Sequence, residues 1–348
     1  MVYVNYNNDV SFNCQGVFVG KLDQKQLAKQ LGVSQMTISR VLNDQPGVGI
    51  KLKKRIQDAI QKQGYIPDHL ASGLRSKSTP ALGLIIPDVS SSFFPEITKE
   101  IEKKARAAGY SVILSHSYES YETECEAINL LRGFRVSGFI IAPAGNQKQV
   151  AGYELLQQAG IPFVFIDRIK THVQCSYVIT DIKEGATKVA EYLAEKGYKK
   201  WGYLRGPRGV SSSDEHLAGI KNGLKNCGLS SDAIKLTEAG FDEHDGYEAA
   251  KKLLKEKPDV IIATNDLVAV GAYRYLKEQK CHVPRDIALV GFSDLKGSDI
   301  MEVPLTTVRE QTVLIGQEAF NILLNAMYNG HDVKQIRLGA ELVIRNSA

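Results

Sequence analysis

The residues whose types and spacing best suit a chemical task lie between positions 24 and 44, in the segment QKQLAKQLGVSQMTISRVLND. Apolar residues repeat there at helical spacing, Gly32 interrupts the repeat, and Ser34 can cap a second helix that follows it. The second helix has one apolar face, and its other face carries short polar side chains and one arginine. Side chains of that kind reach base edges when the second helix of a helix-turn-helix enters the major groove of DNA. The segment therefore predicts DNA binding, with a generic helical hairpin as the alternative.

The same segment resembles the headpiece of lactose-repressor (LacI/GalR) family transcription regulators, whose signature is A-x-x-x-G-V-S-x-x-T-(V/I)-S-R-V-L-N. Eleven positions match it in register, namely Ala28, Gly32, Val33, Ser34, Thr37, Ile38, Ser39, Arg40, Val41, Leu42 and Asn43. The resemblance implies base contacts from Gln35, Met36 and Arg40. It implies phosphate contacts or further base contacts from Ser34, Thr37, Ser39 and Asn43. Arg40 has the paired donors that suit guanine, whereas Met36 offers apolar contact, for example to a thymine methyl group.

The resemblance continues through YIPDHLASGLRS, which precedes a Ser/Thr/Pro-rich linker. It implies a short hinge helix that folds only on DNA, with Leu74 inserted into the minor groove and Arg75 beside it. Gly73 lowers the helix propensity of this stretch by about 1 kcal/mol, which is compatible with folding on binding. The alternative is that Leu74 is an ordinary linker residue.

Beyond Pro80 the chain alternates short apolar runs with helical stretches of ten to fifteen residues. The predicted strands are ALGLIIP, YSVILSH, GFIIAP, PFVFID, YVITD, WGYLRG, DVIIAT and IALVGF. Near-continuous apolar runs of this length are typical of parallel sheets that are covered on both faces. About nine such strands form one oversized sheet or two modest ones. We expect two lobes with a cleft between them, because ligands bind at the carboxyl ends of strands in such sheets.

This body also resembles the family, and through it the type-I periplasmic sugar-binding fold. Segments such as PDVSSSFFPEITKEIEKKARAAGY, GIPFVFIDR and VPRDIALVGFSD occur in the family's order. The resemblance implies effector contacts from Phe93, Phe94, Asp167, Arg168, His216, Phe241, Asn265, Ser293 and Asp294. Aromatic rings and planar polar groups are the composition that a sugar site requires, although Phe93 or Phe94 can equally be core.

Two of these positions depart from the family pattern. His216 stands where many relatives have arginine, and Ser293 stands where they have aspartate. The departures imply a different ligand or a rearranged site. Together, His216, Arg168 and Arg208 around one cleft would suit an acidic sugar, although Arg208 can also face solvent.

Charge and length agree with a two-part chain. Residues 1–78 carry a net charge of +6 and the remainder −2, which favours a polyanion-binding module on a near-neutral body.

We expect a poorly ordered leader over residues 1–20, an all-α headpiece over 21–67 with a third helix from about Lys51, and a hinge over 68–79. The α/β effector domain takes residues 80–348, with an N-lobe (about 80–180 and 310–340) and a C-lobe (181–309 and 341–348). The expected protein is a cytoplasmic homodimer that binds a pseudo-palindromic operator and a small sugar-like effector.

Other function classes find little support. The five cysteines are scattered and form no C-x-x-C pair, so neither a disulfide framework nor a zinc site is expected. Phosphate-loop, dinucleotide and nucleophile-elbow motifs are absent, and no cofactor or membrane span is predicted. A transporter's solute-binding protein would fit the body alone, but it needs an export signal and no basic headpiece. A sugar-converting enzyme would need a catalytic pair in the cleft.

Overall fold

The computed structural model describes residues 24–42, 45–63, 79–90, 92–330 and 332–348. The chain separates into two compact units, residues 1–75 and 76–348, and each is described by itself. Several predicted features lie outside the described residues: the leader over 1–20, Asn43, and the hinge with Leu74 and Arg75.

The headpiece consists of three helices, α1 (Gln24–Leu31), α2 (Gln35–Leu42) and α3 (Ile50–Gln63). Their apolar faces meet in a small core of Leu27, Ala28, Ile38, Val41 and Ile56. The turn between α1 and α2 contains Gly32 at φ +65°, a left-handed conformation that glycine adopts without steric penalty. The predicted helix-turn-helix is therefore confirmed.

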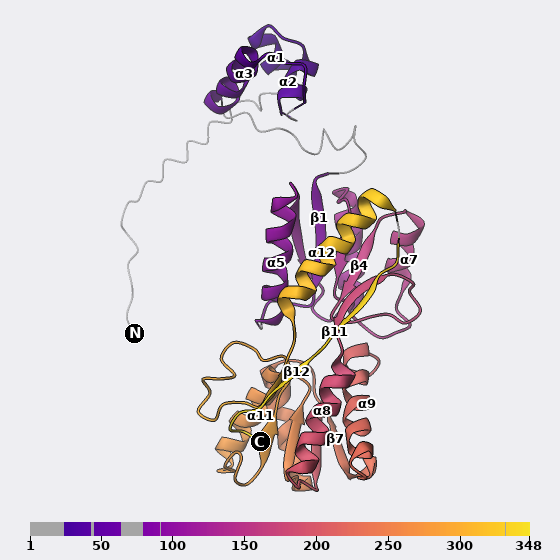
Figure 1. Cartoon of the computed structure of the whole chain (residues 1–348), viewed down its shortest axis with the longest axis vertical. Helices are drawn as coiled ribbons and strands as arrows, with labels where there is room; N and C mark the ends of the chain where they lie inside the picture. The colour runs from indigo at the N-terminus through magenta and orange to yellow at the C-terminus, as the bar shows by residue number, and fades with distance from the viewer. Residues whose placement is uncertain (1–23, 43–44, 64–78, 91, 331) are drawn as a thin grey trace, which may run out of the picture. The chain divides into compact units, whose positions relative to one another are not determined.

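The N-lobe contains a six-stranded, wholly parallel sheet. Its order is β11 (Gln335–Leu338), β5 (Ser176–Thr180), β4 (Phe163–Ile166), β3 (Phe139–Ile141), β1 (Ala81–Ile86) and β2 (Ser111–His116). Helices α5 (Phe93–Ala107) and α12 (Thr312–Asn329) lie side by side over one face (Figure 1). Helices α6 (Tyr121–Gly133) and α7 (Ala151–Gln158) cover the other. The sheet is thus buried between two apolar layers.

The C-lobe contains a four-stranded parallel sheet, ordered β7 (Ile234–Glu238), β6 (Trp201–Arg205), β8 (Val260–Ala263) and β9 (Ala288–Val290). Helices α8 (Ile182–Glu195) and α9 (Ser211–Asn226) cover one face, and α10 (Glu243–Leu253) and α11 (Asp266–Glu278) cover the other. Short 3₁₀ turns lie at Ser231–Ala233 and Leu254–Glu256. Helices α8 and α9 approach closely at Gly219, where a Cβ atom would lie 2.4 Å from the Lys183 carbonyl oxygen.

Two short strands, β10 (Thr307–Arg309) and β12 (Glu341–Val343), pair antiparallel beside the C-lobe. In the described part of the body, the chain passes between the lobes at three points: from β5 to α8, from β10 to α12, and from β11 to β12 (Figure 1). All eight predicted strands are present. The additional strands β7, β10, β11 and β12 are short or carry exposed polar residues.

One detail of the strand prediction was wrong. YSVILSH was expected to be covered on both faces, but β2 lies at the edge of its sheet and its side chains are partly exposed, with Leu114 at 39%. An edge strand has a neighbour on one side only, so its apolar composition does not guarantee burial.

Candidate functional site

Helix α2 presents the predicted DNA-reading face. Gln35, Met36 and Arg40 are exposed, and Met36 is an apolar side chain that remains 65% exposed. The opposite face packs through Ile38 and Val41 into the headpiece core. The apolar packing therefore directs the candidate base readers outward.

Ser34 and Thr37 are already engaged with each other. The Thr37 amide donates to Ser34 Oγ at 3.1 Å, and the two hydroxyls lie 2.9 Å apart. Ser34 is therefore the N-cap of α2, as predicted, and this bond fixes where the helix begins. Ser39 and Thr37 are half-buried beside the exposed face.

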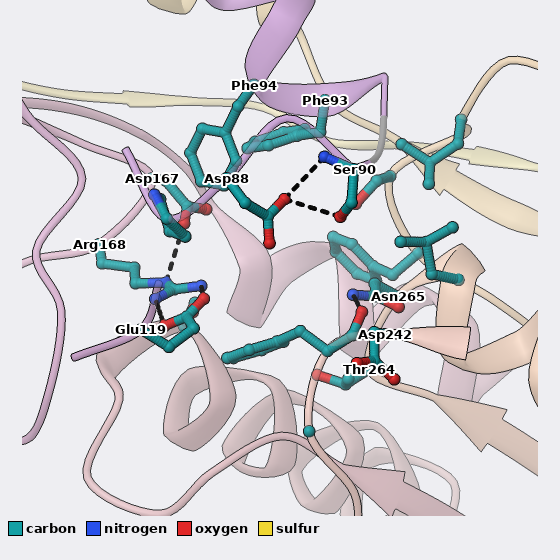
Figure 2. A pocket seen from close by; sticks show the side chains of 18 of the residues that line it. Asp88, Ser90, Phe93, Phe94, Glu119, Asp167, Arg168, Asp242, Thr264 and Asn265 are labelled. Atoms are coloured by element: carbon teal, nitrogen blue, oxygen red, sulfur yellow. Dashed lines mark hydrogen bonds and ion pairs between the residues drawn. The ribbon is translucent and has the colours of Figure 1, made fainter. Parts of the chain in front are cut away.

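The candidate ligand site is a cavity of about 310 Å³ between the lobes (Figure 2). Its walls come from segments that follow the carboxyl ends of the strands, such as Asp88 after β1 and Asn265 after β8. Eight of the nine predicted effector residues line it, namely Phe93, Phe94, Asp167, Arg168, His216, Phe241, Asn265 and Ser293. The structure does not bring Asp294 to the cavity, because its carboxylate pairs with Arg309 at 2.8 Å and with Arg345 at 2.6 Å.

Arg168 is held by the protein itself. Its guanidinium donates two bonds to the Glu119 carboxylate, at 2.6 and 2.9 Å, and its Nε lies 3.0 Å from Asp167 (Figure 2). It also lies over the Phe241 ring, 4.6 Å from the centroid. Burial opposes the charged form, but Glu119 and Asp167 together raise the pKa of Arg168 above its ordinary value. Burial raises the pKa of Asp167 to about 6, against the lowering effect of Arg168.

The aromatic residues occupy two sides of the cavity. Phe93 and Phe94 open α5 and meet edge to face, with ring centroids 5.0 Å apart. Each is 8% exposed and belongs to the N-lobe core as well as to the cavity wall. Phe241 lines the cavity from the C-lobe segment that precedes α10. A ring-shaped ligand could therefore contact apolar surface from both lobes.

Asn265 has a structural task beside any ligand contact. Its Oδ1 accepts from the Val268 amide at 2.8 Å and caps α11, while its Nδ2 donates to the Phe241 carbonyl at 2.8 Å. The amide therefore fixes the position of the Phe241 segment relative to α11.

The two departures from the family pattern lie in the cavity. His216 is 2% exposed, stacks on Tyr203 and meets Phe292 edge to face. Neither of its ring nitrogens has a partner among the described residues. Burial lowers the pKa of His216 to about 3, so the ring is neutral at physiological pH. Ser293 donates to Glu310 at 2.8 Å.

These contacts contradict the acidic-sugar hypothesis. His216 carries no charge, and Arg168 is neutralised by two carboxylates. Arg208 does not line the cavity; its side chain is 74% exposed and pairs with Glu238. None of the three expected cations is available to an anionic ligand.

Sequence reasoning missed five carboxylates of the cavity, Asp88, Glu119, Asp242, Asp245 and Glu310. Asp88 and Glu119 follow β1 and β2, so the rule that ligands bind at carboxyl ends of parallel strands could have found them. Glu310 follows β10, a three-residue strand that no apolar run marks. Burial raises its pKa to about 7, and the nearby Asp167 adds to the effect.

Among the described residues, no cluster of histidine, cysteine and acidic side chains has the arrangement of a metal site. None of the described helices is both long and apolar enough to span a membrane.

The fold and the cavity define a two-lobed α/β ligand-binding protein preceded by a helix-turn-helix headpiece. Residues 79–345 match the family model described as periplasmic binding proteins and sugar binding domain of LacI family, and residues 25–68 match that of bacterial regulatory proteins, lacI family. The chain therefore belongs to the LacI family of DNA-binding transcription regulators. This membership accounts for the headpiece, which a transporter's solute-binding protein would not have, and it places the chain among regulators and not among enzymes.

Individual relatives agree over nearly the whole chain. Catabolite control protein A of Priestia megaterium is 30% identical over 304 residues, which is 86% of this chain and 91% of the relative. The ribose operon repressor of Halalkalibacterium halodurans is 28% identical over 326 residues, or 93% of this chain and 96% of the relative. The crystal structure of the lac repressor dimer bound to operator and the anti-inducer ONPF superposes with a TM-score of 0.83 at 25% identity, covering 93% of this chain and 98% of that one.

Proposed function

We propose that this chain is a homodimeric repressor whose affinity for an operator is controlled by a small sugar-like molecule that binds in the interlobe cavity. The observation that carries the proposal is the composition of that cavity, which takes aromatic and polar side chains from both lobes. A ligand that contacts both lobes binds best in one lobe arrangement and so shifts the population toward it. Control by a ligand requires such a difference in affinity.

Direct contacts join the two lobes. The Ile169 amide of the N-lobe donates to Ser211 Oγ of the C-lobe at 2.9 Å, and Arg168 lies over the Phe241 ring. Arg337 on β11 makes two bonds to Glu215 on α9, at 3.0 and 2.9 Å. Each of these contacts depends on how the lobes are arranged, so a second arrangement of the lobes would have a different set of contacts.

For the headpiece we propose that Gln35, Met36 and Arg40 read base edges, while Ser39 and the outer atoms of Ser34 and Thr37 contact phosphates. One headpiece reads half of a site, so a symmetric dimer reads a pseudo-palindrome. The lac repressor structure, in which a dimer holds operator DNA, supports this assembly. The named ribose operon repressor supports a carbohydrate as the effector class, and DNA binding implies action in the cytoplasm.

The experiment for this proposal is Arg40→Ala, assayed by fluorescence anisotropy on a selected operator and on a shuffled duplex. Arg40→Ala removes one two-bond contact to guanine from each half-site, so at about 1 to 3 kcal/mol per contact it should weaken operator binding by about 2 to 6 kcal/mol and leave weak, salt-sensitive binding to both duplexes. Lys62→Ala, at the last turn of α3, removes the same charge from the headpiece and should preserve discrimination between the duplexes. Wild-type operator affinity in Arg40→Ala would show that α2 is not the reading helix.

A further inference from the structure

The interlobe cavity is strongly acidic. Six carboxylates line it, from Asp88, Glu119, Asp167, Asp242, Asp245 and Glu310. Arg168 is the one lysine or arginine among its described lining residues. The lining as a whole therefore repels anions and attracts cations.

Four of the six carboxylates have an evident counter-charge. Glu119 and Asp167 share the guanidinium of Arg168. Asp242 and Asp245 open α10 as a capping box, in which the Asp245 amide donates to Asp242 Oδ1 at 2.8 Å. The positive end of the helix dipole stabilises carboxylates at this position.

Asp88 and Glu310 have no such partner. Asp88 Oδ1 accepts from the amide and hydroxyl of Ser90, at 2.8 and 2.7 Å, and its other oxygen points into the cavity (Figure 2). Glu310 is 8% exposed and accepts from Ser293. No lysine or arginine of the described residues forms an ion pair with either carboxylate. Asp88 is half-buried and Glu310 is buried, and a buried carboxylate is unfavourable unless a cation accompanies it.

His216 provides an independent indication that this cavity binds a ligand. It lines the same cavity at 2% exposure, and both ring nitrogens lack a partner among the described residues. A neutral imidazole can donate one hydrogen bond and accept another, as a hydroxyl group of a ligand requires. Because His216 is neutral, it does not offset the negative charge of the cavity. An arginine at this position would reduce that charge.

We infer that the ligand of this cavity is a cation, namely a sugar-like molecule with a free amine, and that Asp88 and Glu310 balance its charge. This inference rests on the proposed function and names the chemical class of its effector. An ammonium group supplies three hydrogen-bond donors, and a carboxylate oxygen accepts such bonds. The rings of Phe93, Phe94 and Phe241 supply apolar faces for the carbon frame, and His216 pairs with a hydroxyl.

The test is isothermal titration calorimetry of the full chain against matched sugars in the gluco, galacto and manno series. Each series contains the 2-amino sugar, its N-acetylated form, the parent hexose and the uronic acid. In at least one series, the amine should bind at least about tenfold more tightly than its N-acetylated and parent forms, because a charge-assisted bond is lost in both. The uronic acid should bind most weakly.

Two variants locate the charge. Asp88→Asn and Glu310→Gln retain the shape and an acceptor oxygen, and each should weaken binding of the amine about tenfold or more while leaving binding of the parent hexose nearly unchanged. Glu154→Gln removes one exposed carboxylate from α7, outside the cavity, and should alter neither affinity. Thermal melting of each variant establishes that it folds.

Three results would overturn the inference: a neutral or acidic sugar that binds as tightly as its amine, no binding of any amine at millimolar concentration, or unchanged amine affinity in both cavity variants. Operator binding measured on the same preparations separates this inference from the proposed function. If a neutral or acidic sugar alters operator affinity, the ligand class is wrong and the proposed control stands. If an amine binds with the expected preference but operator affinity does not respond, the ligand class stands and the control fails.

Discussion

The ion pair between Arg337 and Glu215 joins the two lobes without lining the cavity, so it tests whether the lobe arrangement sets ligand affinity. The perturbation is a double-mutant cycle of Arg337→Ala and Glu215→Ala. The pair makes two bonds, and its side chains are 36% and 23% exposed. Exposed ion pairs contribute about 0.2 to 1 kcal/mol and charge-assisted buried bonds contribute more, so we expect a coupling energy of about 1 kcal/mol.

The assay measures both urea unfolding and the affinity of the tightest-binding sugar. If the ligand prefers the lobe arrangement that this pair stabilises, each single variant should lower ligand affinity by up to about fivefold, the equivalent of 1 kcal/mol. Arg274→Ala and Glu243→Ala form the matched control, because that pair joins α11 to α10 within the C-lobe. A coupling energy near zero, or ligand affinity equal to wild type in both Arg337→Ala and Glu215→Ala, would refute the reasoning.

The assembly, the hinge and the charge of Glu310 can each be tested. Removing residues 1–79 should leave a dimer by light scattering, because we expect the subunit contacts between effector domains; a monomer at micromolar concentration would move the interface to the headpiece. Leu74→Ala should weaken operator binding and reduce the change in operator affinity that the effector causes, both measured by anisotropy. Effector affinity measured by calorimetry should not change. A full effector response in this variant would show that the hinge only connects the two domains. Because burial raises the pKa of Glu310 to about 7, its contribution to stability is present at low pH and is lost as pH rises from about 4.5 to 7. Glu310→Gln should therefore raise the Tm more at pH 8 than at pH 5; an equal shift at both would contradict the raised pKa.

The architecture was largely predictable because its signals are local. Apolar runs such as FVFI at β4 and VIIA at β8 mark buried parallel strands, and Gly32 marks the turn of the headpiece. Strands β10 and β12 carry no such signal, because three residues that pair at the side of a lobe need no apolar run.

The sequence predicted most of the residues that line the cavity, but it did not predict the charge that they present to a ligand. Phe241 and Asn265 were placed at the cavity by resemblance, and the structure brings them together. The ion pair of Arg168 with Glu119 joins residues 49 positions apart, and no sequence pattern records that pairing. Without knowledge of that pairing, the sequence predicts that Arg168 is a cation available to the ligand. The neutral state of His216 depends on burial against Tyr203 and Phe292, which is likewise a tertiary property.

The most direct test of a ligand-controlled, sequence-specific regulator is one anisotropy experiment on the full chain. A palindromic duplex selected from a random library is titrated at fixed salt beside its shuffled counterpart, with and without the tightest-binding sugar. We expect at least about 10³-fold preference for the selected duplex, and a change of about fivefold or more in that affinity when the sugar is present. Equal affinity for both duplexes, or an operator affinity that the bound sugar leaves unchanged, would contradict this expectation.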